Sequence, residues 1–297
     1  MASLDLGALE IFRCVAQERS ISGAAARLGR VQSNVSTRLK QLEETLGAAL
    51  FLRTRRGLTL TEAGRTLLDY AERLLALSRE ASDALRDGRP RGVLRLGTME
   101  STAAARLPTI LAGYHAQFPE VAVHLHTDTA GGLMDCLARG DIDAAFIAEP
   151  VPDAAFDQRP VFLESLVLIG SATGPSTYRN EDLNGRTIIA FEEGCAYRRY
   201  LHEWLLEQRI APGGTLSVGS YLAMIACVSA GAGYAVVPQS VLATVRCGDE
   251  VRRYPLSGKH AAIRTMLARR PGYSSANLDA LDALLPGLAE DNQASPG

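Results

Sequence analysis

Residues 20–46 contain two short helix-forming segments that are separated by a single glycine. The first segment carries apolar side chains at the spacing of one helix face, and Ser20 or Ser22 can cap its first turn. Its small side chains allow another helix to approach closely, and Gly29 can adopt the backbone conformation that a tight turn requires. The pattern therefore predicts two helices joined by a tight turn. The apolar positions of residues 6–18 predict an earlier helix that completes a small core.

The second helix of this pair has two chemically different faces. Val35, Leu39, Leu42 and Leu46 recur at intervals of four and three residues, so they form one apolar stripe that packs inward. The opposite face carries hydroxyl, amide and basic side chains, which can reach base edges or phosphates in the major groove of DNA. A solvated surface is the commoner explanation of one amphipathic helix, but the preceding helix and turn favour a helix-turn-helix. The residues expected to contact DNA are Gln32, Ser33, Asn34, Ser36, Thr37, Arg38 and Lys40.

A second candidate DNA contact lies a few residues further along the chain. Residues 50–60 form two short apolar segments around a basic turn that contains a glycine, a pattern that predicts the wing of a winged helix. Arg53, Arg55 and Arg56 lie in or beside this turn, and their guanidinium groups suit phosphate contacts or the minor groove. A basic turn is usually only a solvated turn, but its position directly after the helix-turn-helix favours DNA.

Five sequence blocks within residues 6–64 resemble the DNA-binding domain of LysR-type transcriptional regulators. The blocks, in the order and spacing of the family, are Ala24-Ala25-Ala26-Arg27-Leu28, Gln32-Ser33-Asn34-Val35-Ser36, Leu42-Glu43-Glu44-Thr45-Leu46-Gly47, Leu50-Phe51-Leu52-Arg53-Thr54 and Leu60-Thr61-Glu62-Ala63-Gly64. Two positions depart from the common pattern, since many members have Ser or Thr where Val31 stands and Arg where Thr37 stands. The resemblance implies a transcriptional regulator with a winged helix-turn-helix and an effector domain similar to periplasmic solute-binding proteins.

Residues 61–85 predict one long helix, which at 1.5 Å per residue would span roughly 37 Å. Its apolar side chains alternate at spacings of four and three residues, which is the heptad pattern of a coiled coil. They are Ala63, Leu67, Tyr70, Leu74, Leu77, Ala81 and Ala84. Packing of this helix on its own domain is the alternative, but so regular a seam favours a homodimer. We expect these dimers to pair as a homotetramer and to bind a roughly palindromic promoter site.

The predicted domains follow from these patterns. Residues 1–60 form the winged helix-turn-helix domain, residues 61–87 the linker and dimerisation helix, and residues 88–92 a hinge with glycine and proline. Strands and helices alternate from residue 93 to residue 297, which predicts an effector-binding domain of two doubly wound, parallel α/β lobes. The first lobe comprises about residues 93–162 and 267–290, and the second about residues 163–266. A single helix is expected to reach Phe118, and strands are expected at residues 163–169 and 263–268.

The loops at the carboxyl ends of the predicted strands are candidates for an effector site, because ligands of such sheets bind there. Hydroxyl groups and free backbone N–H groups at helix N-termini favour a small anionic metabolite, although Glu100 could instead meet the amine of a ligand. Each loop alone is more simply a helix cap, but their convergence on one cleft favours a site. The candidate effector-binding residues are Thr98, Met99, Glu100, Ser101, Thr102, Thr127, Cys195, Ala196, Tyr197 and Ser220.

Charge is distributed unevenly along the 297 residues. Residues 1–60 hold nine basic and five acidic side chains, a net charge of +4, whereas the remainder holds 22 and 28, a net charge of −6. This asymmetry is typical of a DNA-binding module joined to a sensor. The five cysteines are widely separated and form no CxxC pair, which indicates reduced thiols. Because no signal-peptide pattern or membrane-length apolar run occurs, we expect a cytoplasmic protein without membrane association.

Other classes of function have less support in the sequence. No GxSxG, HExxH or phosphate-loop motif occurs, and no GxGxxG follows a predicted strand, so we expect neither an enzyme nor a cofactor. The dispersed histidines predict no metal site. A redox-sensing regulator of the same family is the alternative, because Cys195 lies where peroxide-sensing members carry a reactive thiol. The expected partners are double-stranded promoter DNA, a small-molecule effector and further copies of this chain, with RNA polymerase as an additional candidate.

Overall fold

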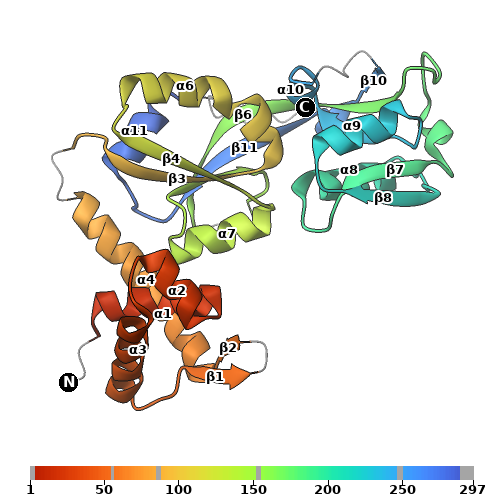
Figure 1. The fold of residues 1–297 in the computed structure, drawn as a ribbon. Coiled ribbons are helices and arrows are strands. Elements are labelled where there is room, and N and C mark those ends of the chain that lie inside the picture. The colour runs from red at the N-terminus through yellow and green to blue at the C-terminus, as the bar shows by residue number, and fades with distance from the viewer. Residues whose placement is uncertain (1–3, 55–56, 85–87, 152–154, 246–249, 288–297) are drawn as a thin grey trace. The chain divides into compact units, whose positions relative to one another are not determined.

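The chain folds into two compact units, one formed mainly by residues 1–87 and the other mainly by the residues that follow, in the computed structural model (Figure 1). The structure describes residues 4–54, 57–84, 88–151, 155–245 and 250–287. The first unit is mostly helical with a small two-stranded sheet, and the second contains a larger curved sheet with helices packed on it. Within the described ranges, no helix combines the length and the apolar character that crossing a membrane requires.

The first unit begins with the predicted helices and wing. In chain order its elements are α1 (Leu6–Glu18), α2 (Ile21–Leu28), α3 (Gln32–Leu46), β1 (Phe51–Thr54) and β2 (Gly57–Leu60). The Ser20 hydroxyl accepts the backbone N–H of Gly23 at 3.3 Å and caps α2. Gly29 ends this helix with a φ of 62°, which confirms the predicted glycine turn. Val31 precedes α3 without a side-chain cap, as the sequence predicted.

The start of the wing and the start of the following helix are held together by local contacts. Glu43 accepts the backbone N–H of Leu50 at 2.7 Å, so the end of α3 fixes the start of β1. The Thr61 hydroxyl accepts the N–H of Gly64 at 2.9 Å and donates to the carbonyl oxygen of Ala49 at 2.7 Å. A Cβ atom on Gly64 would lie 2.2 Å from the carbonyl oxygen of Leu50, so this close approach requires glycine.

The long helix α4 (Glu62–Ala84) agrees with the helix that the sequence predicted, whose last residue, Leu85, lies outside the described residues. One face of α4 packs on the first unit, where Ala71 is fully buried among the side chains of α1. Of the predicted dimer seam, Tyr70, Leu74 and Leu77 are 56%, 37% and 60% exposed, whereas Leu67 packs against the core of the first unit. This protomer therefore leaves much of the seam uncovered, as a face reserved for a second copy would be.

The second unit contains a mixed sheet with the strand order β10-β6-β11-β5-β3-β4, and β9 also pairs with β6. Its first lobe contains β3 (Gly92–Thr98), α5 (Glu100–Ala105), α6 (Leu107–Gln117), β4 (Val121–Thr127), α7 (Ala130–Arg139), β5 (Ala144–Ala148), β11 (Ala262–Arg269) and α11 (Ala276–Asp282). Strands β4, β3 and β5 are parallel to one another, which places their carboxyl ends at the same edge. Figure 1 shows α6 and α11 on one side of this lobe and α7 on the other.

The second lobe has a smaller parallel pair of strands beside the long strand β6. Its elements are η1 (Asn180–Leu183), β7 (Thr187–Phe191), α8 (Ala196–Glu207), β8 (Gly214–Val218), α9 (Tyr221–Ser229), β9 (Ala235–Pro238), α10 (Gln239–Leu242), β10 (Val251–Pro255) and η3 (Gly258–Ala261). Strands β7 and β8 are parallel, so β7 and β8 also end at a common edge. The alternating βα pattern therefore produces the two predicted lobes within one continuous unit.

Strand β6 (Asp157–Ser171) differs from the predicted strand at residues 163–169 because it runs through both lobes. Its first part, as far as Ser165, pairs with β11, and its last part pairs with β9 and β10. All of these pairings are antiparallel, so the prediction of wholly parallel lobes was wrong at this crossover. A long return strand can add to a parallel sheet in the antiparallel direction, which periodicity alone does not reveal.

The helix expected to reach Phe118 without interruption is broken at Arg106 into α5 and α6. Pro108 lies in the first turn of α6, where it cannot donate the backbone hydrogen bond that a continuous helix needs. The sequence interpretation overlooked this proline. The break has a consequence for the site, since it frees the Arg106 side chain to reach the crossover strand β6.

Candidate DNA-binding face and effector cavity

Helix α3 presents the polar face that the sequence predicted. Val35 and Leu39 are buried in the core of the first unit. The candidate DNA contacts on this helix are all exposed, and they are Gln32, Ser33, Asn34, Ser36, Thr37, Arg38 and Lys40. Arg38 lies 3.6 Å from Asp5, and Lys40 lies 3.7 Å from Glu44. Because such exposed ion pairs contribute little stability, phosphate groups can compete for both basic side chains.

The wing contributes one described basic side chain to this face. Arg53 is exposed on β1, where it is paired across the sheet with Leu58. Arg55 and Arg56 lie outside the described residues, so their predicted DNA contacts stay predictions. The sequence interpretation left out Arg30, which is exposed in the turn directly before α3. A basic residue beside the first turn of this helix is a further candidate for phosphate contact.

The second unit contains a cavity of about 330 Å³ between its two lobes. The first lobe contributes the starts of α5 and α7 and the end of β4 to its wall. The second lobe contributes the ends of β7 and β8 and the starts of α8 and α9. The lining residues are Met99, Glu100, Ser101, Thr127, Asp128, Thr129, Ala130, Phe191, Glu192, Cys195, Ala196, Tyr197, Val218, Gly219, Ser220 and Tyr221. The loops that the sequence selected therefore meet at one cavity.

Two of the ten candidate effector residues do not belong to this lining. Thr98 is fully buried at the end of β3, and its hydroxyl donates to the carbonyl oxygen of Met99 at 3.1 Å. Thr102 is 1% exposed on α5, and its hydroxyl has no hydrogen-bond partner in the described part of the chain. Both threonines lie behind the lining. Successive residues of a strand or a helix point in different directions, so Thr98 and Thr102 point into the protein while their neighbours line the cavity.

Several lining residues were not among the candidate residues. Phe191 and Val218 are the last residues of β7 and β8, and Glu192 directly follows β7. The rule that ligands lie at the carboxyl ends of strands would have found these positions. Asp128 and Tyr221 stand directly beside candidate residues in loops that were identified. Asp128 and Glu192 thus add two carboxylates to the predicted lining, and Phe191 and Tyr221 add two aromatic rings.

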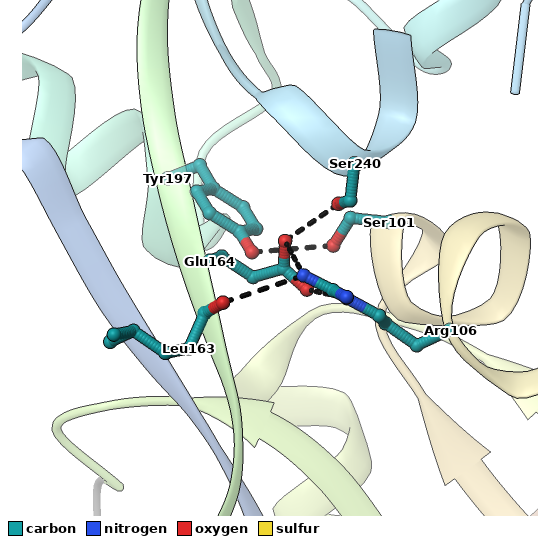
Figure 2. Close-up of polar contacts among 6 residues, drawn as sticks. All are labelled: Ser101, Arg106, Leu163, Glu164, Tyr197 and Ser240. Atoms are coloured by element: carbon teal, nitrogen blue, oxygen red, sulfur yellow. Dashed lines mark hydrogen bonds and ion pairs between the residues drawn. The ribbon is translucent and has the colours of Figure 1, made fainter. Parts of the chain in front are cut away.

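Polar contacts join the two lobes beside the cavity (Figure 2). The Ser101 hydroxyl on α5 donates to the Tyr197 hydroxyl on α8 at 3.4 Å. The Glu164 carboxylate on β6, whose side chain is only 2% exposed, accepts two hydrogen bonds from Arg106, at 2.6 and 3.1 Å. It also accepts the Ser240 hydroxyl of α10 at 2.6 Å. Figure 2 shows these residues converging from α5, β6, α8 and α10, so this network connects both lobes to the crossover strand.

Burial changes the ionisation of groups in the cavity wall. Glu100 accepts the backbone N–H of Tyr221 at 3.1 Å, a contact between the two lobes. Burial raises the pKa of the Glu100 carboxyl, and this N–H only partly opposes the change. Burial also raises the pKa of the Tyr197 and Tyr221 hydroxyls, which stay neutral at physiological pH. The wall thus combines neutral hydroxyls and aromatic rings with the Glu100 carboxyl, whose ionised form burial destabilises.

Cys195, the thiol of the alternative redox hypothesis, precedes the first turn of α8 in the cavity wall. Burial raises the pKa of this thiol, and the Glu100 carboxylate adds to the increase. A raised pKa lowers the thiolate fraction, which is the form that reacts with peroxide. Among the described residues, no three His, Cys, Asp or Glu side chains come together as a metal site.

These two features define a DNA-binding protein with a winged helix and a two-lobed ligand-binding unit. Residues 6–65 match the family of bacterial regulatory helix-turn-helix proteins of the lysR type, and residues 87–287 match the LysR substrate binding domain. The chain is 35% identical over 295 residues to the uncharacterised HTH-type transcriptional regulator YusT of Bacillus subtilis (strain 168). That alignment covers 98% of this chain and 99% of the relative. The chain therefore belongs to the LysR family of DNA-binding transcriptional regulators.

Solved structures with similar folds extend over almost the whole chain. A full-length variant of OxyR from Pseudomonas aeruginosa has a TM-score of 0.74 at 23% identity, covering 95% of this chain and 93% of that one. Full-length CbnR in complex with its target DNA has a TM-score of 0.68 at 22% identity, covering 95% and 99%. At this level of identity the likeness concerns the fold, and it supports the combination of a winged helix with a two-lobed effector-binding domain.

Proposed function

We propose that this regulator binds a promoter site as a homodimer or homotetramer through α3 and the wing, and that a small molecule bound in the cavity switches it. The observation that carries the proposal is the exposed polar face of α3, whose apolar side chains pack against the core. Short hydroxyl and amide side chains on such a face suit contacts to base edges in the major groove. No catalytic step forms part of this proposal.

The cavity supports a mechanism for the switch. Its wall comes from both lobes, so a ligand that contacts both stabilises one arrangement of the lobes over others. The Glu100–Tyr221 and Ser101–Tyr197 contacts link the same lobes. A ligand that replaces or reinforces these contacts changes the arrangement of the lobes and, through the dimer, the spacing of the DNA-binding domains.

Replacement of Gln32 and Arg53 by alanine separates base recognition from phosphate contact. We expect Gln32→Ala to weaken binding to the wild-type promoter site by roughly 1–3 kcal/mol, or about fivefold to 150-fold, because it removes a base contact. Binding to unrelated DNA should not change. Arg53→Ala should weaken binding to the promoter site and to unrelated DNA alike. It should also reduce the magnitude of the slope of log affinity against log salt by about one. Mobility-shift titrations at several salt concentrations measure these effects.

Thr45→Ala is the matched control for this experiment, because Thr45 is exposed near the opposite end of the same helix. It should bind the promoter as wild type does. Equal promoter affinity for Gln32→Ala and wild type would contradict the role of Gln32 in base recognition.

Replacement of Cys195 by serine tests the alternative of redox switching. Since burial raises the pKa of this thiol, we expect the variant and wild type to bind promoter DNA equally, before and after exposure to hydrogen peroxide. The measurement is a mobility-shift titration with oxidised and reduced protein. A peroxide effect present in wild type and absent in the variant would establish Cys195 as a redox switch.

A further inference from the structure

We infer that the effector carries a cationic group, an ammonium, that pairs with Glu100 and lies against the aromatic wall of the cavity. The inference rests on the proposed function of the cavity as the effector site. It replaces the anionic effector that the helix N-termini suggested from the sequence, and it follows the alternative in which Glu100 meets an amine. Three observations support it: the charges of the lining, the occupied N-terminus of α9 and the aromatic rings of the wall.

The charged side chains that line the cavity are all acidic. They are Glu100, Asp128 and Glu192, and the described lining contains no lysine, arginine or histidine. Arg198, in the first turn of α8, lies outside this lining. Arg198 donates to the carbonyl oxygen of Phe191 at 2.7 Å and to the Ser217 hydroxyl at 3.1 Å. An anionic ligand would therefore enter a negatively charged wall without a basic partner.

The N-terminus of α9, one of the helix starts at the cavity, already holds a carboxylate. Helix α9 begins at Tyr221, and the backbone N–H of Tyr221 donates to one oxygen of the Glu100 carboxylate at 3.1 Å. Glu100 thus occupies the position that a ligand carboxylate would take at this helix end. The second oxygen of Glu100 has no hydrogen bond in the described part of the chain, so it remains able to accept from an ammonium.

Aromatic residues complete the site for a cation. Phe191 and Tyr221 lie edge to face with ring centroids 4.7 Å apart, and Tyr197 and Tyr221 with centroids 6.4 Å apart. Tyr221 is only 4% exposed and is one of three aromatic residues in the lining, with Phe191 and Tyr197. An ammonium in the cavity can interact with the faces of these rings. Burial also raises the pKa of Glu100, a cost that a bound cation would relieve.

Thermal-shift measurements on the full-length protein test the charge of the effector directly. The probes are straight-chain compounds of four to six carbons in three matched sets: diamines, amino acids and dicarboxylates. We expect stabilisation only by compounds that carry an ammonium group. Glu100→Gln should weaken that binding at least tenfold, because the amide keeps the acceptor for Tyr221 but loses the charge. Asp135→Asn removes an exposed carboxylate on α7 that does not line the cavity, and it should bind as wild type does.

The outcomes separate this inference from the proposed function. Stabilisation by dicarboxylates alone would overturn the cationic effector and leave the cavity as the effector site. Ammonium binding that Glu100→Gln does not weaken would overturn the role of Glu100 and with it the inference. If no compound of any charge stabilised the protein, the proposed effector function of the cavity would fail together with the inference.

Discussion

Replacing Leu74 and Leu77 together by glutamate is expected to lower affinity for the promoter site by about a hundredfold or more. Both side chains lie on the exposed seam of α4, where they are 37% and 60% exposed in one protomer. Two carboxylates in a coiled-coil seam oppose each other across the two-fold axis, so the dimer should dissociate. A monomer binds only one half-site. In the dimer, binding of the first DNA-binding domain holds the second at a high effective concentration near the other half-site, and the monomer loses this advantage.

Two measurements establish this result. Sedimentation velocity should show a monomer, and mobility-shift titration should show the loss of affinity. Ser82→Glu adds one carboxylate at an exposed position of α4 outside the seam, and it should remain dimeric. A Leu74→Glu, Leu77→Glu protein that stayed dimeric and bound the promoter normally would show that another surface forms the dimer.

Replacing Arg106 by leucine is expected to lower the free energy of unfolding of the effector-binding domain by about 3 kcal/mol. The variant leaves the Glu164 carboxylate, only 2% exposed, with the Ser240 hydroxyl as its remaining side-chain partner in the described network. We use the lower end of the usual range because the Arg106 side chain is 34% exposed. For a domain of this size, calorimetry should record a midpoint roughly 6–12 °C lower.

The double variant Arg106→Leu, Glu164→Leu distinguishes an unpaired charge from lost packing. Because it removes the unpaired Glu164 carboxylate together with Arg106, it should recover at least half of the lost free energy of unfolding. Arg106 also lies over the ring of Phe162, with its guanidinium carbon 5.7 Å from the ring centroid, and the double variant does not restore that contact. A double variant no more stable than Arg106→Leu would assign the whole loss to packing.

Local patterns in the sequence predicted the first unit well. The stripe from Val35 to Leu42 repeats at the spacing of one helix face, and a glycine stands where α2 has to turn. Such features depend on residues only a few positions apart, so periodicity and turn chemistry are sufficient to identify them. The same is true of the four loops around the cavity, because each follows a strand whose end could be predicted.

Features that depend on distant residues could not be predicted in the same way. The partner of Arg106 is Glu164, which is 58 residues further along the chain, and no local pattern connects them. The antiparallel pairing of β6 depends on which strands lie beside it rather than on its own composition. The contact between Glu100 and the backbone N–H of Tyr221 is a further example, because these residues are 121 positions apart and belong to different lobes.

The continuous strand β6 limits how the two lobes can move. Its pairing passes from β11 to β9 between Ser165 and Leu166, next to the Glu164 ion pair. A strand hydrogen-bonded at both ends can twist, but it cannot lengthen, so the lobes can turn about β6 far more easily than they can separate along it. Under the proposed function, ligands of different shapes would differ in the angle at which they hold the two lobes.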